Sequence, residues 1–208
     1  MRRLNRSLLA GQIGVFAGLA TAPPPTEPAP DPEPDPGPTS PVDGMTVTRT
    51  HVSGPFNAYA TNERQQPIVF RAPSVTIPSG AGTYLLMEMG ATGIGCGVWY
   101  QDGNLRMRAG SGSAGTPNTD YVYVDTAVTQ GAVMDITWEF DPAANTARLW
   151  YDNTLVITAT ASPGYPEWAG GDNAGYGSTN SSLAVSVPST PWPTASSPLE
   201  AYINQRVV

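Results

Sequence analysis

Short runs of alternating or apolar residues, each ended by Gly, Pro, Asn or Asp, fill the chain from residue 42 onward. No stretch keeps the 3.6-residue apolar period and the end caps that an amphipathic helix needs. Many short runs separated by turn residues are typical of an antiparallel β-sandwich or barrel. The sequence therefore predicts strands over residues 45–52, 67–72, 74–77, 83–90, 96–101, 105–110, 120–125, 132–140, 147–152, 154–161, 182–187 and 199–207.

Three of the intervening turns have hairpin chemistry. Asp102-Gly103 separates two strand-like runs by two residues, and both residue types accept the positive φ of a tight hairpin turn. Asp152-Asn153 repeats this arrangement with a weaker residue at the second position. The connection 141–146, DPAANT, suits a longer loop built on a type I turn, and its proline is expected to end the preceding strand.

The first 41 residues differ from the rest of the chain. Residues 1–22 have a basic start, a short apolar middle and small residues at the end, which is the layout of a secretory signal. A retained anchor and a cleaved signal are both compatible with this segment, whose apolar part is too short to span a membrane. Residues 23–41 are about half proline with acidic residues between, which predicts an extended polyproline II linker. We therefore expect the β-sandwich to occupy residues 42–208.

Charge and composition disfavour several classes of function. The net charge of −7 disfavours nucleic-acid binding, because phosphate contacts need basic patches. The single cysteine, Cys96, lies in a Gly-rich apolar run that favours a small buried side chain. His51 is the only histidine, so a zinc site or a His-based triad has almost no support.

Four segments follow one another in a characteristic order. Residues 83–110, TYLLMEMGATGIGCGVWYQDGNLRMRAG, form an early hairpin pattern, and residues 132–156, AVMDITWEFDPAANTARLWYDNTLV, form a central one. WAGGDNAGYGSTNSSLAVSV at 168–187 is a Gly-rich loop before a strand, and LEAYINQRVV at 199–208 is a closing strand. This order resembles the concanavalin A-like lectin/glucanase superfamily, and within it the laminin-G-like jelly rolls. The resemblance implies an all-β, antiparallel two-sheet jelly-roll sandwich over about residues 45–208, and Asn153 stands where that family usually has glycine.

Because the superfamily includes glucanases, two carboxylates need examination. Retaining glycosidases use two carboxylates about 5–5.5 Å apart, and the glucanase pattern places them on one strand as E-x-D-x-E or close to it. Glu139 and Asp141 fit the first two positions, but Ala143 stands at the third. We therefore predict that these carboxylates lie on a solvated strand face running into a turn, and that the chain is not an enzyme.

Side chains that could bind a sugar gather in the loop 164–180, GYPEWAGGDNAGYGSTN. Sugar sites combine an aromatic ring with carboxylate and amide groups that hydrogen-bond hydroxyls. The candidates in this loop are Trp168, Asp172, Asn173, Tyr176 and Asn180. The alternative is a Gly-rich connection in which Trp168 only packs. The resemblance also allows a calcium site, with Asp172, Asn173, Asp120 or Asp125 as candidate ligands.

Trp150 is a further candidate. It lies on the strand face opposite to Leu149 and Tyr151, where a half-buried strand ordinarily has a polar residue. Two interpretations are open: a loop or partner subunit covers the ring, or the ring is a flat surface for a carbohydrate ligand.

These features predict a non-enzymatic carbohydrate-binding module displayed on a stalk. The preferred setting is a bacteriophage virion, in which residues 1–22 dock onto other virion proteins and the sandwich contacts cell-surface polysaccharide, with a homo-oligomer as an open alternative. A secreted or cell-surface bacterial lectin-like protein with a cleaved signal is the second hypothesis, and a glucanase-type glycosidase is the least favoured. No cofactor is expected apart from the calcium alternative.

Overall fold

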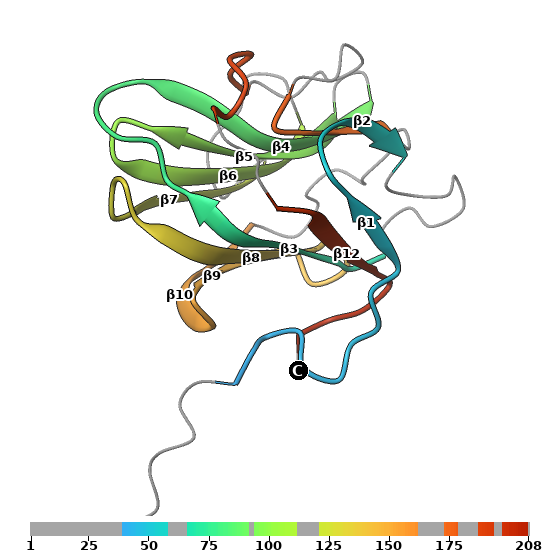
Figure 1. Ribbon diagram of the computed structural model, residues 1–208. Coiled ribbons are helices and arrows are strands. Elements are labelled where there is room, and N and C mark those ends of the chain that lie inside the picture. The colour runs from blue at the N-terminus through green and yellow to red at the C-terminus, as the bar shows by residue number, and fades with distance from the viewer. Residues whose placement is uncertain are drawn as a thin grey trace, which may run out of the picture. The chain divides into compact units, whose positions relative to one another are not determined.

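The structure, a computed structural model, describes residues 39–57, 66–91, 94–111, 121–161, 173–178, 187–193 and 197–207. These residues form two six-stranded sheets, one above the other, in which neighbouring strands pair antiparallel (Figure 1). The described residues include no helix, and therefore none that could cross a membrane. The predicted all-β sandwich of two antiparallel sheets is confirmed.

The first sheet has the strand order β1-β12-β3-β8-β9-β10 and the second has the order β2-β11-β4-β5-β6-β7. The strands of the first sheet are β1 (Arg49–His51), β12 (Leu199–Ile203), β3 (Ile68–Thr76), β8 (Val133–Asp141), β9 (Thr146–Tyr151) and β10 (Thr154–Thr160). The strands of the second sheet are β2 (Gly54–Asn57), β11 (Asn173–Tyr176), β4 (Thr83–Ala91), β5 (Ile94–Gln101), β6 (Asn104–Ser111) and β7 (Tyr121–Ala127).

The predicted hairpins form where the turn chemistry placed them. Asp102 and Gly103 have φ values of 50° and 94° and join β5 to β6. Asp152 and Asn153 have φ values of 45° and 68° and join β9 to β10. Strand β8 ends directly before Pro142, as predicted.

Three features of the sheets differ from the sequence pattern. The runs 67–72 and 74–77 form one strand, β3. Its register against β8 shifts between Ala72 and Val75, as at a β-bulge, and Ser74 within this irregularity has a φ of 53°. Strands β2 and β11 were not predicted, and they pair with each other at the edge of the second sheet. The predicted strand at 182–187 falls almost wholly outside the described residues.

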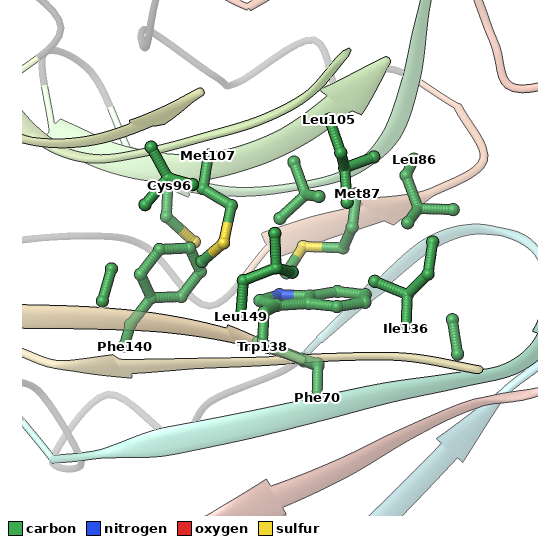
Figure 2. Packing of buried hydrophobic residues seen from close by; sticks show 14 of the residues in the cluster. Phe70, Leu86, Met87, Cys96, Leu105, Met107, Ile136, Trp138, Phe140 and Leu149 are labelled. Atoms are coloured by element: carbon green, nitrogen blue, oxygen red, sulfur yellow. The ribbon is translucent and has the colours of Figure 1, made fainter. Parts of the chain in front are cut away.

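Apolar side chains from the inner faces of both sheets fill the space between the layers (Figure 2). Trp138 of β8 is fully buried and stacks on Phe70 of β3, with ring centroids 5.6 Å apart. From the second sheet, Met87 and Met107 pack into the same cluster. Cys96 is buried as predicted, and burial raises the pKa of its thiol, so the thiol stays protonated.

Candidate functional site

Trp150 lies on the outer face of the first sheet, between Thr137 of β8 and Leu155 of β10 in the strand register. Its side chain is only 5% exposed. A pocket of about 670 Å³ adjoins it, lined on one side by residues 39–41 and 43–45 and on the other by residues 205–207. Trp150 is therefore covered, and the cover comes from the two ends of the sandwich chain rather than from a neighbouring loop of the sheet.

The carboxylates Glu139 and Asp141 lie under the same cover. Glu139 is 0% exposed and Asp141 is 2% exposed, so the prediction of a solvated strand face is wrong. The reason is the tail segment, residues 205–207, which crosses the outer end of β8. Glu139 accepts a hydrogen bond from the Val207 amide at 2.8 Å, and Asp141 pairs with Arg206 Nε at 2.9 Å.

Arginine side chains complete the bonding of both carboxylates. Arg148, the neighbour of Glu139 on β9, places its Nε 2.6 Å from Glu139 Oε2. Arg206 also donates from Nη2 to Asp141 Oδ1 at 3.3 Å. Desolvation nevertheless raises the pKa of Glu139, because burial outweighs the stabilising contacts with the Val207 amide and Arg148. Both carboxylates hold the tail segment, which is a structural task.

The linker-end segment, residues 39–48, is fastened to the end of the chain. Gln205 accepts from the Thr46 amide at 2.8 Å and donates to the Thr46 carbonyl at 2.7 Å. The Thr48 amide donates to the Ala201 carbonyl at 2.8 Å, next to the pairing of β1 with β12. Figure 1 shows the start of the described chain and the C-terminal end below the first sheet. Residues 39–41, the last of the predicted linker, already line the Trp150 pocket.

The candidate loop 164–180 is only partly described. Trp168, Asp172 and Asn180 lie outside the described residues. Asn173 begins β11, and its side chain lies outside the described part.

Tyr176 is described, and it does not present its ring at the surface. The ring is fully buried in the core, its hydroxyl donates to the Ser197 carbonyl at 2.8 Å, and burial raises its pKa to about 12. The prediction that Tyr176 stacks on a sugar is therefore corrected, because residues alternate along β11 and this one points inward.

The calcium alternative gains no support from the described residues. Asp125 of β7 accepts from Asn104 Nδ2 at 2.6 Å with one oxygen and pairs with Arg106 Nη2 at 3.0 Å with the other. Asp120 and Asp172 lie outside the described part. Within the part of the chain that the structure describes, no three His, Cys, Asp or Glu side chains come together as metal ligands would.

The outer face of the second sheet carries a cluster that the sequence reasoning missed. We call it the aromatic–arginine face, and its members are Trp99, Arg106, Arg108, Tyr121 and Tyr123. Alternation explains their side of the sheet: Val98, Met107, Ala109, Val122 and Val124 from the same three strands are in the core. The sequence does contain a signal for this cluster. The spacings R-x-R on β6 and Y-x-Y on β7 each place two side chains on one face, and β6 and β7 are neighbouring antiparallel strands.

Contacts tie the face together across the strands. The Arg108 guanidinium carbon lies 3.7 Å from the centroid of the Tyr121 ring, a cation–π contact. The Tyr123 ring lies 6.3 Å from both the Tyr121 and Trp99 centroids. Arg106 pairs with Asp125 and also bonds Gln101. Trp99, Arg108 and Tyr121 are packed into this cluster and are only 5%, 8% and 8% exposed, whereas Tyr123 is half-buried.

One end of this face is approached closely by another part of the chain. Gly97 of β5 is the register neighbour of Arg108, and a Cβ atom at Gly97 would lie 2.5 Å from Val187 Cγ1. Glycine is therefore needed at this position for the segment at 187 to pass over the sheet. Toward β7, by contrast, the side chains of Arg106 and Asp125 are 24% and 31% exposed.

Comparisons with known proteins show the fold and no closer family. No model of a protein family matches the chain, and no curated protein matches it. Among solved structures, the CBM40 module of the Ruminococcus gnavus IT-sialidase bound to α2,3-sialyllactose has a TM-score of 0.51 at 14% identity, over 79% of this chain and 91% of that chain. The same module bound to α2,6-sialyllactose gives 0.50 at 16% identity, over 79% and 92%.

A third similar structure is an enzyme. The leech intramolecular trans-sialidase complexed with 2,7-anhydro-Neu5Ac has a TM-score of 0.50 at 9% identity, over 78% of this chain and 25% of that chain. At these identities the likeness shows a shared all-β sandwich fold. The narrower concanavalin A-like assignment and the phage setting stay predictions.

Proposed function

We propose that the sandwich is a non-enzymatic carbohydrate-binding module that contacts cell-surface polysaccharide through the outer face of the second sheet. The observation that carries this proposal is the accessible end of the aromatic–arginine face, where the half-buried Tyr123 ring lies beside the partly exposed Arg106 and Asp125. Aromatic rings pack on the C–H face of a pyranose, and charged side chains hydrogen-bond its hydroxyls. The similar fold of modules that bind sialyllactose supports the same class of ligand.

The half-buried end of the face is the place for the sugar ring. Tyr123 offers its ring there, and Arg106 and Asp125 lie in the neighbouring register row. The loop 164–180 joins the same sheet through β11, which is separated from β7 by β4, β5 and β6, so its candidates Trp168, Asp172, Asn173 and Asn180 are proposed to contact a different part of the same polysaccharide chain. Binding through a shallow, wet surface is expected to be weak per module and strengthened by several copies.

A glycan array tests the proposal with matched variants. We expect wild type to bind, and Tyr123→Ala and Trp168→Ala to lose binding while their melting temperatures stay close to that of wild type. Val156→Ala, an exposed residue on β10 of the other sheet, is the control and should bind as wild type does. If no glycan binds wild type, the module function fails and the sandwich is a structural or protein-docking piece.

The finer proposal is display on a virion. It rests on the sequence of residues 1–41, which combines an anchor-like segment with a proline-rich spacer. The competing proposal is a secreted or cell-surface lectin-like protein with a cleaved signal. Purifying the native protein decides between them: co-purification with particles and an intact Met1 by mass spectrometry support the virion, and a free protein lacking residues 1–22 supports secretion.

A non-enzymatic role is also part of the proposal. Glu139 and Asp141, the carboxylates nearest to a glucanase pattern, are occupied by Val207, Arg148 and Arg206. A glycosidase needs its acid and nucleophile open to the scissile bond. Release of reducing sugar from glucans by the purified protein would contradict this part.

A further inference from the structure

We propose that the pocket beside Trp150 is a second ligand site, separate from the aromatic–arginine face, and that it takes a single neutral pyranose unit. The pocket has a volume of about 670 Å³ and is built from three parts of the chain: Trp150 of β9, residues 39–41 and 43–45 of the linker-end segment, and the tail residues 205–207. It lies on the first sheet, whereas the proposed polysaccharide surface lies on the second.

Apolar groups supply the surface against which a sugar ring packs. Met45 and Val207 line the pocket from the two walls, and Trp150, which is only 5% exposed, contributes the small part of its side chain that these segments leave uncovered. A pyranose has apolar C–H faces and a rim of hydroxyls, so it matches a pocket that has apolar and polar groups together.

Hydrogen-bonding groups stand on opposite walls. Arg206 of the tail is held by Asp141 through Nε at 2.9 Å and Nη2 at 3.3 Å, which fixes the guanidinium and directs Nη1 to another acceptor. Asp43 of the linker-end segment uses Oδ2 to accept from the Ser40 amide at 3.1 Å, so its Oδ1 can accept from a ligand. A hydroxyl both donates and accepts, and therefore one ring can satisfy both walls.

The balance of charge favours a neutral sugar over an acidic one. The charged side chains that line the pocket are Asp43 and Arg206, one of each sign, and the buried Glu139 and Asp141 below it are paired with Arg148 and Arg206. This lining leaves no surplus of positive charge to hold an anionic ligand, so a neutral ring fits it better.

The site depends on the two chain ends lying together. Gln205 bonds the Thr46 backbone in both directions, and the tail is fastened to Glu139 and Asp141. Because both walls contribute to the pocket, a bound sugar would link the linker end to the sandwich body. The module would then hold two sugar residues on opposite faces.

Methyl-labelled methionine in the full chain reports binding at this pocket. Met45 lines the pocket and is half-buried, whereas Met87, Met89 and Met107 are in the core. We would titrate methyl α-glycosides of glucose, galactose and mannose and follow the ¹³C-methyl signals. At least one should shift the Met45 methyl signal saturably, with a Kd on the order of 1–20 mM, and leave the core methionines unshifted.

Variants separate this site from the surface on the second sheet. Asp43→Asn should weaken binding about tenfold, because it replaces a charged acceptor of a sugar hydroxyl by a neutral one. Tyr123→Ala should leave the Met45 titration unchanged even where it abolishes polysaccharide binding. The methyl α-glycoside of glucuronic acid should bind more weakly than that of glucose.

Three results would overturn the inference: no Met45 shift with any of the three neutral glycosides, equal binding by wild type and Asp43→Asn, or tighter binding of the glucuronide than of the glucoside. Loss of Met45 shifts in Tyr123→Ala would place the sugar on the second sheet instead. Failure of the glycan array with a preserved Met45 titration would overturn the polysaccharide surface and leave the pocket standing.

Discussion

The outer faces of the two sheets carry similar side chains, but the two faces differ in how deeply the carboxylates of their ion pairs are buried. On the first sheet, the ion pair of Glu139 and Arg148 has its carboxylate under the tail segment: the Glu139 side chain has 0% exposure, while that of Arg148 is 27% exposed. On the second sheet, the ion pair of Arg106 and Asp125 is a cross-strand pair of the same kind, but its side chains are 24% and 31% exposed. Cover by a distant segment, rather than the residues of the strand, decides whether the carboxylate of such a pair is buried or exposed.

The largest expected contrast between the faces comes from their aromatic residues. Trp150→Ala should lower the free energy of unfolding by about 3–5 kcal/mol, because it removes a large covered ring. Tyr123→Ala, on the more accessible part of the second sheet, should cost less than about 1 kcal/mol. Urea denaturation of both variants measures the difference. Equal losses would mean that the second face is as structural as the first.

Removing the carboxylate of the ion pair on each face should give the next largest difference in the free energy of unfolding. Glu139→Ala should cost about 3 kcal/mol, since it leaves Arg148 and the Val207 amide without their acceptor. Glu139→Gln retains an acceptor for the amide and should cost about 1 kcal/mol. The matched change Asp125→Ala should cost less than about 1 kcal/mol, because that pair is partly exposed. A larger loss for Asp125→Ala than for Glu139→Ala in the same denaturation assay would contradict the proposed role of the tail as cover.

The pH dependence of stability sharpens the same comparison. Burial raises the pKa of Glu139 above its ordinary value of 4.5, so the folded state holds this proton more tightly than the unfolded state. The contribution of Glu139 to stability is therefore full below pH 4.5 and is lost as the pH rises through the folded pKa. We expect the free energy of unfolding of wild type to fall relative to that of Glu139→Gln as the pH rises from 4.5 through the raised pKa of Glu139. A relative rise over this range would mean that pairing with Arg148 outweighs desolvation.

Local sequence predicted the parts of the fold that local chemistry decides. The hairpins at Asp102-Gly103 and Asp152-Asn153 formed because two adjacent residues set the turn. The strand β11, NAGY, has no strand pattern of its own because it is short and contains glycine, and its pairing with β4 makes it a strand. Propensity within such a segment contains no information about a partner strand far away in sequence.

The candidate site depended on contacts that no local pattern contains. The burial of Glu139 is due to Val207, which lies 68 residues further along the chain. Tyr176 was expected at a surface, but the register of β11 against β4 turned it inward. The aromatic–arginine face was present in the sequence as R-x-R and Y-x-Y spacings, and only the pairing of β6 with β7 shows that these residues share one face.

The smallest expected difference in stability is between variants of the two tight hairpin turns, one on each sheet. In the second sheet, a Cβ atom at Gly103 would lie 2.9 Å from Gln130 Nε2, and Gln130 Oε1 accepts from the Gly80 amide at 2.7 Å. Gly103→Asn should therefore cost about 1 kcal/mol, because the incoming side chain displaces this bonded amide.

In the first sheet, Asn153 already adopts a φ of 68°, which asparagine tolerates better than most residues. Asn153→Gly relieves the remaining backbone strain but increases the conformational entropy of the unfolded chain, and these two effects oppose each other. Its free energy of unfolding should thus stay within about 0.5 kcal/mol of wild type. Thermal melts of the two variants side by side test this asymmetry. If Gly103→Asn is as neutral as Asn153→Gly, the Gln130 contact does not constrain the second-sheet turn, and the two hairpins are interchangeable.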